Sequence, residues 1–212
     1  YLANPAGIFF GKQAVVNAAQ FYAVAGQISD ADFLSYRDHF TSLSGSICQE
    51  GPLSAEAVYR LARYVENGGT IVAPGGIVAM ASGSDVLVGA DKSQVFVKMT
   101  ASSVTALPAA ESDPFGAGDI TGSLLAHTST LKAQNIEIQA PGALVAVNGA
   151  IDVSSAAPAT LGGNLVITGK LVDVQSADLN ADGPAGGGTI FIGGDYQGAG
   201  EVPTAERTRL MG

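Results

Sequence analysis

The stretch Leu144–Ala156, LVAVNGAIDVSSA, is echoed 21 residues later by Leu165–Ala177, LVITGKLVDVQSA. Leu, Val, Asp, Val, Ser and Ala coincide in the two stretches, and most other positions are apolar or small in both. A second echo aligns Gly162–Ile167 with Gly187–Ile192 at an offset of 25 residues. Repeats of roughly 20–25 residues, each with two or three short strands and Gly or Asn corners, are typical of a β-solenoid.

In a solenoid each rung pairs with its neighbours, so equivalent positions stack into apolar ladders inside and polar ladders outside. We therefore predict that the two echoing stretches lie on adjacent rungs and pair in parallel. Leu144 is expected over Leu165 and Val153 over Val174, with all four side chains pointing inward. A β-sandwich is the alternative, because it too is built from short strands separated by turns, although its strands need not repeat at a fixed offset.

Composition excludes several classes of protein. The 212 residues hold 10 Lys and Arg against 19 Asp and Glu, a net charge of −9, which argues against a nucleic-acid partner. Hydrophobic residues make up 47% and charged residues 14%, enough to bury a core rather than remain disordered. The 28 glycines indicate many sharp turns. No run reaches the roughly 18 apolar residues of a membrane span.

One segment, Asp30–Tyr64, breaks the strand pattern and is predicted to be an excursion from the coil. Within it, Ser54–Tyr64 (SAEAVYRLARY) has apolar residues at helical spacing and a Ser that could cap the first turn. The sequence therefore predicts a short helix at Ser54–Tyr64. The chain begins at Tyr1 in the middle of a pattern, so we expect it to be a fragment of a longer product.

The N-terminal residues resemble a known family. Asn4–Gly11 (NPAGIFFG), followed by Ala14–Asn17, resembles the NPNGI-type motif and following strand of the filamentous-haemagglutinin family, in the two-partner-secretion or haemagglutination-activity domain. Ala6 stands where that motif has Asn. The segments that agree in order and spacing are Gln27–Leu34, Val65–Ala73, Gly75–Ala81 and the glycine-rich Gly186–Gly198.

The resemblance implies an all-β, right-handed parallel β-helix that is exported through an outer-membrane transporter of the Omp85 type. It implies an extracellular or bacterial cell-surface location and a role in adhesion or surface assembly, without a cofactor. Residues 1–135 would then be the distal part of the secretion domain, with the excursion at 30–64, and residues 136–212 would be continuing glycine-rich rungs. Asn4, Pro5, Gly7 and Ile8 are the residues that resemble the secretion motif.

Two short motifs suggest chemistry. Asp113–Asp119 (DPFGAGD) resembles the anion-hole motif of ribokinase-type sugar kinases, but that mechanism needs a helix after Asp119, and the following sequence is β-like. Asp178, Asn180 and Asp182 match the first half of a calcium loop, although Thr189 stands where the bidentate Glu belongs. These three residues are a weak calcium candidate beside the simpler interpretation of a polar corner.

Catalytic residues are scarce. His39 and His127 are far apart in sequence, no G-x-S-x-G elbow is present, and Cys48 fits a buried small residue better than a nucleophile. The sequence predicts a structural protein without catalytic residues, and the alternative is a carbohydrate-active β-helix enzyme, a polysaccharide lyase or hydrolase. The strands at both ends, Gly7–Phe10 and Thr189–Ile192, are apolar and predict open edges. We expect the chain either to continue into further rungs of a longer parent protein or to associate end to end with copies of itself.

Overall fold

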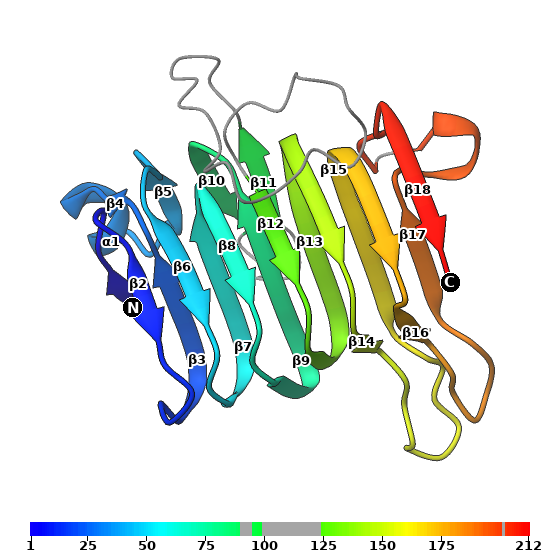
Figure 1. The fold of residues 1–212 in the computed structure, drawn as a ribbon. Coiled ribbons are helices and arrows are strands. Elements are labelled where there is room, and N and C mark those ends of the chain that lie inside the picture. The colour runs from blue at the N-terminus through cyan, green and yellow to red at the C-terminus, as the bar shows by residue number, and fades with distance from the viewer. Residues whose placement is uncertain (90–94, 99–123, 201) are drawn as a thin grey trace.

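The chain is a coil of parallel strands whose successive rungs lie side by side from the N-terminal to the C-terminal end (Figure 1). The structure is a computed structural model that describes residues 1–89, 95–98, 124–200 and 202–212. Every pairing within its 14-stranded sheet is parallel, as expected for a parallel β-helix and unlike the antiparallel sheets of a sandwich. The fold class predicted from the sequence is therefore confirmed.

The strands of the coil follow the chain in order. They are β1 (Leu2–Ala3), β2 (Ile8–Phe10), β3 (Val16–Val24), β6 (Ser46–Gln49), β7 (Leu53–Ala62), β8 (Tyr64–Asn67), β9 (Ile71–Ser82), β12 (Leu124–His127), β13 (Thr130–Val147), β14 (Ala150–Asp152), β15 (Asn164–Gln175), β16 (Asp178–Asn180), β17 (Thr189–Ile192) and β18 (Arg207–Met211). The boundary expected after residue 135 falls inside β13.

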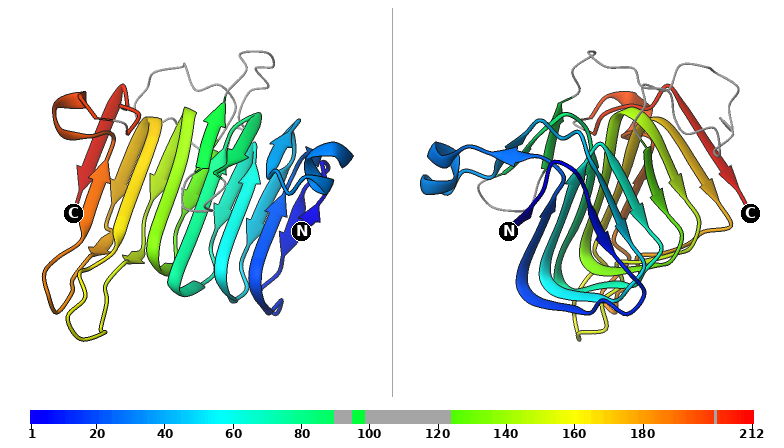
Figure 2. Two further views of the ribbon diagram at one scale, coloured as in Figure 1. Left: turned by 180° about the vertical axis from the view of Figure 1, so that it is seen from behind. Right: turned by 60° about the vertical axis from the view of Figure 1, so that its left-hand side comes forward.

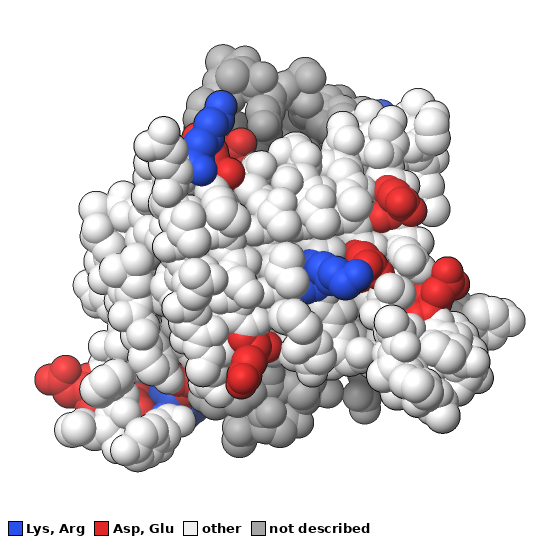
Figure 3. Space-filling view, turned by 90° about the horizontal axis from the view of Figure 1, so that it is seen from below, with Lys and Arg blue, Asp and Glu red and all other residues white. Residues whose placement is uncertain are grey.

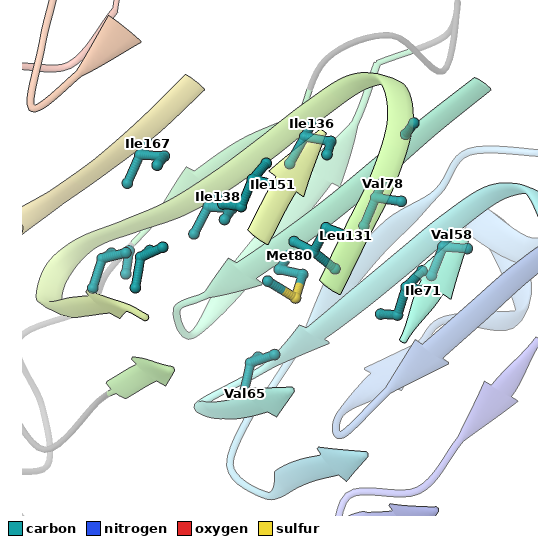
Figure 4. Close-up of a cluster of buried hydrophobic side chains, with 14 of the residues drawn as sticks. Val58, Val65, Ile71, Val78, Met80, Leu131, Ile136, Ile138, Ile151 and Ile167 are labelled. Atoms are coloured by element: carbon teal, nitrogen blue, oxygen red, sulfur yellow. The ribbon is translucent and has the colours of Figure 1, made fainter. Parts of the chain in front are cut away.

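The interior of the coil is filled by apolar ladders. Val58 of β7, Val78 of β9, Ile136 of β13 and Leu165 of β15 are in register on four successive rungs, and none is more than 1% exposed. Burying each such side chain contributes roughly 1.5–3 kcal/mol before the entropy cost of ordering the chain. Figure 4 shows Val58, Val78 and Ile136 among the apolar side chains of one continuous cluster, to which Leu165 also belongs. Burial of these stacked apolar side chains stabilises the packing of each rung on the next.

A second, smaller sheet covers one outer face of the coil. It is antiparallel, in the order β11 (Val95–Lys98), β10 (Asp85–Val88), β5 (His39–Thr41) and β4 (Gln27–Ile28). Phe40 and Val86 of this sheet pack with Tyr22, Tyr59 and further outward-facing residues of β3, β7 and β9 in a second core. Figure 2 shows this region projecting to one side when the coil is seen nearly end on.

The helix predicted at Ser54–Tyr64 is wrong. Leu53–Ala62 is strand β7, paired in parallel with β3 and β9. Both faces of its second half are buried, one in the coil and one under the small sheet, so the period-2 alternation disappears and the apolar spacing imitates a helix. The α-helix of the described residues is α1, Asp30–Leu34, whose N-cap Ser29 accepts a hydrogen bond from the Asp32 amide at 3.0 Å.

The excursion is shorter than the expected 30–64. Residues 27–41 form β4, α1 and β5 outside the coil, whereas β6, β7 and β8 are regular parts of it. Further along the chain, residues 85–88 and 95–98 add β10 and β11 to the same outer sheet. The excursion is thus built from two segments far apart in the sequence.

The register expected from the 21-residue echo is also wrong. β13 and β15 are adjacent and parallel, but Leu144 pairs with Leu171, Leu165 with Ile136 and Val174 with Val147. Val153, Leu165 and Val174 lie in the interior cluster as expected, whereas Leu144 is buried outside that cluster, because its neighbours Ala143 and Val145 are the residues of β13 that point inward. The long corner at residues 154–163 lengthens this rung, so the offset between paired residues differs from the 21-residue offset of the sequence repeat. The 25-residue echo is confirmed, since Asn164–Ile167 pairs with Thr189–Ile192 in that register.

Candidate functional site

The residues that resemble the secretion motif, Asn4, Pro5, Gly7 and Ile8, lie in a tight turn that leads into the coil. The Gly7 amide donates to the Asn4 carbonyl at 3.0 Å, and the Ala6 amide donates to the Asn4 side-chain oxygen at 3.1 Å. Gly7 has φ +116, and a Cβ there would lie 2.9 Å from the Ser46 carbonyl oxygen, so both the backbone and the neighbouring rung require glycine. The motif is therefore a structural device for starting a rung.

The four residues of this turn differ in their exposure to solvent. Asn4 and Pro5 are exposed, whereas Gly7 and Ile8 are half-buried, and Ile8 pairs with Ile47 of the next rung. The apolar half anchors β2 to the coil, and the polar half remains on the surface of the turn. A partner could therefore reach Asn4 and Pro5 without unfolding the rung.

The three calcium candidates lie at the C-terminal end of the coil. Asp178 and Asn180 occupy alternate positions of β16, and Asp182 follows in the corner. The Asn180 side-chain oxygen already accepts a hydrogen bond from the Asp182 amide at 3.0 Å. A hollow of about 690 Å³ adjoins them, lined also by Gly187, Gly188 and Ile190. Among the described residues, no group of three His, Cys, Asp or Glu is placed to hold a metal ion.

A polar network inside the coil was not anticipated from the sequence. Arg60 of β7 is fully buried in a ladder between Ala23 and Met80. Its guanidinium donates to the Asn67 side-chain oxygen at 3.1 Å, to the Glu66 carbonyl at 2.7 Å and to the Met80 sulfur at 3.7 Å. All three acceptors are uncharged. Burial lowers the pKa of the Arg60 guanidinium to about 9.

Asn67 extends this network to a buried histidine. Its side-chain amide donates to the Gly69 carbonyl at 2.8 Å and lies 3.1 Å from His127 Nδ1, which is therefore the acceptor. His127 Nε2 then carries the proton and faces the Ala150 carbonyl at 3.4 Å. Burial lowers the pKa of His127 to about 4, so the imidazole is neutral at pH 7. His127 has no free nitrogen with which to activate a nucleophile.

The other histidine is held between two carboxylates of the excursion. His39 Nε2 lies 3.0 Å from Asp85 and Nδ1 lies 3.5 Å from Asp32, which ties β5 to β10 and to α1. Hydrogen bonding from Ser29 lowers the pKa of Asp32. Burial raises the pKa of the Cys48 thiol, whose sulfur lies 3.8 Å from Glu66, and so opposes a reactive thiolate.

Charged side chains are sparse on the surface. Figure 3 shows a lower face that is mostly uncharged, with isolated basic and acidic groups. A second hollow, of about 670 Å³, adjoins the corner loop at residues 154–162 and the turn at Pro74 and Gly75. Lys132, which also lines it, is paired with Asp152 at 2.6 Å. The residues of the kinase-like motif, Asp113–Asp119, lie outside the described residues.

These observations define a parallel β-helix with an extra-helical antiparallel sheet. The fold is similar to that in the crystal structure of the HMW1 secretion domain from Haemophilus influenzae, with a TM-score of 0.64 and 20% sequence identity. The match covers 99% of this chain, which spans 61% of the length of that domain. No protein-family model matches the sequence, and no curated protein matches it. No helix among the described residues could span a membrane.

Proposed function

We propose that this chain is part of a secreted or cell-surface structural protein of the filamentous-haemagglutinin type, exported by two-partner secretion. The observation that supports this most is the fold of the coil, which is similar to that of a secretion domain in a match that covers 99% of the chain. The turn at Asn4–Ile8 adds a second, independent likeness in sequence. Adhesion or surface assembly would be carried by the shape of the coil and its exposed faces.

The partner implied by this proposal is an outer-membrane transporter of the Omp85 type. The chain would cross it unfolded and form its rungs outside the cell. A coil suits this order of events, because each rung needs only the preceding rung as a template. The final location would be extracellular or on the bacterial cell surface.

The test is export from a host cell. The chain, joined to a cleavable signal peptide, is expressed with and without an Omp85-type transporter from its source genome, and the protein in the medium is measured. We expect export only with the transporter, and a reduced yield for Asn4→Ala. Asn148→Ala, at an exposed Asn outside the segments that carry the resemblance, is the matched control. Equal amounts in the medium without the transporter would contradict the proposal.

The alternative function, a carbohydrate-active β-helix enzyme, has one observation in its favour. The hollow beside β16 is lined by two carboxylates, Asp178 and Asp182. Glycosidases use such a pair. A lyase also needs a basic residue, and none of the described residues that line this hollow is Lys or Arg. A screen against acidic polysaccharides decides the matter: turnover abolished by Asp178→Asn or Asp182→Asn would establish the enzyme.

A further inference from the structure

Two buried polar atoms inside the coil have complementary roles and no hydrogen-bond partner. They are the Nε of Arg60, which is a donor, and the Oε1 of Gln49, which is an acceptor. Arg60 is 0% exposed and Gln49 is 1% exposed, so bulk water reaches neither. Leaving a buried polar group unsatisfied costs about 1–3 kcal/mol, and native proteins seldom tolerate it.

The orientation of Gln49 is fixed by its other contact. Its Nε2 donates to the Gly51 carbonyl at 3.0 Å, so turning the amide over would set two oxygens against each other. Oε1 therefore points away from Gly51.

The neighbouring rung shows what the Gln49 oxygen lacks. Asn67 pairs with Gln49 in register and likewise donates to a carbonyl two residues onward, that of Gly69. The Asn67 oxygen, however, accepts from the Arg60 guanidinium. Rungs are about 4.8 Å apart, so the Gln49 oxygen lies one rung from an atom that Arg60 binds directly.

We infer that a single water molecule is bound inside the coil, accepting from Arg60 Nε–H and donating to Gln49 Oε1. A water fits because it can be acceptor and donor at once. A chloride ion would satisfy the guanidinium but repel the amide oxygen, and a metal cation would be repelled by the guanidinium. Buried waters are known to satisfy paired polar atoms in this way. The water would join Gln49 to the network of Arg60, Asn67 and His127.

The unaltered chain gives the first test. In a high-resolution crystal structure we expect one density peak about 2.7–3.2 Å from both Arg60 Nε and Gln49 Oε1. In solution, the Arg60 Nε proton should show a cross-peak to a long-lived water. Direct contact between the two side-chain atoms, or a bromide signal between them in crystals soaked with bromide, would overturn the inference.

A variant gives the second test. Gln49→Met removes the acceptor, so the cross-peak from the Arg60 Nε proton to bound water should be lost. Gln20→Met, at an exposed position of β3, is the matched control and should keep it. A cross-peak that survives in folded Gln49→Met would mean that Gln49 does not hold the water. If Gln49→Met does not fold, the crystal structure of the unaltered chain decides.

Discussion

The ring of Tyr22 stacks on the ring of Tyr59 one rung away, with centroids 4.4 Å apart and planes 18° from parallel. Tyr1 continues the stack on the other side of Tyr22, at 4.5 Å. The hydroxyls of Tyr1 and Tyr22 both donate to the carboxylate of Asp38, which is buried in the excursion. The stack therefore fastens the excursion to the coil through packing and through a shared charged acceptor.

Removing one hydroxyl tests that fastening. Tyr22→Phe keeps the ring stack but deletes a hydrogen bond to a buried carboxylate, which should lower the free energy of unfolding by about 1.5–3 kcal/mol. Chemical denaturation measures the change. Tyr36→Phe, at a side chain that is 91% exposed, is the control and should change stability by less than about 0.5 kcal/mol. Equal effects from the two variants would show that the Asp38 contact contributes nothing.

The same contact predicts weakening in alkali. Burial and the hydrogen bond to Asp38 raise the pKa of Tyr22 well above its ordinary value of 10.0. The folded phenol thus stays protonated where the unfolded one ionises, so this stability is complete below pH 10 and falls as the pH rises above it. Thermal midpoints measured from pH 8 to pH 11 should drop at the alkaline end. The drop should be smaller in Tyr22→Phe, and an identical pH profile would contradict the assignment.

His127 predicts weakening in acid. Its pKa is about 4 in the folded chain and 6.5 ordinarily, so between these values the unfolded chain binds a proton that the folded chain does not. Stability should therefore fall as the pH drops from 6.5 to 4, by about 3 kcal/mol. The readout is the slope of stability against pH. His127→Leu should lose that slope even if its overall stability is lower, whereas His39→Gln should retain it.

The coil could be predicted from the sequence because the pattern of apolar residues that produces it repeats along the chain. Short apolar runs between Gly and Asn corners that recur at a fixed offset favour stacked rungs over a sandwich, and the 25-residue offset correctly placed Leu165 beside Ile190. The register was not predictable, because corners differ in length: Asn148 and Gly149 turn tightly, whereas residues 154–163 make a long loop. The strand at β7 was missed since the outer sheet buries its second face, which only the tertiary structure reveals.

The burial of Arg60 inside the coil could not be predicted from its residue type, because arginine is almost never fully buried. A signal for its partners was nevertheless present. Gln49 and Asn67 each stand two residues before a glycine, Gly51 and Gly69, at an offset of 18 residues. That offset is the true rung length there, since Gln49 and Asn67 pair in register. An amide ladder at the corners could have been predicted from this spacing.

The calcium candidates predict weak binding at most. The Asn180 oxygen is already a hydrogen-bond acceptor, and the ligand set lacks the bidentate carboxylate of a high-affinity loop. We expect a dissociation constant no tighter than about 1 mM, the weak limit of extracellular modules. Calorimetric titration of the chain and of Asp178→Asn measures it. Micromolar binding that Asp178→Asn abolishes would show a true site.

The last prediction concerns the two ends of the coil, where apolar side chains are exposed. Phe9 and Val15 are 67% and 65% exposed at one end, and Leu210 and Met211 are 61% and 55% exposed at the other. Among the described strands, β17 and β18 each pair on one side only, with β15, which leaves an edge that can accept a further strand.

We predict end-to-end association of the isolated chain. The charge of −9 opposes it, so association should strengthen as salt shortens the Debye length below about 10 Å. Sedimentation across a salt series measures the assembly. Leu210→Lys should reduce the association, and Tyr36→Lys, at a still more exposed position on the excursion, should not. A monomer at every salt concentration would contradict the prediction.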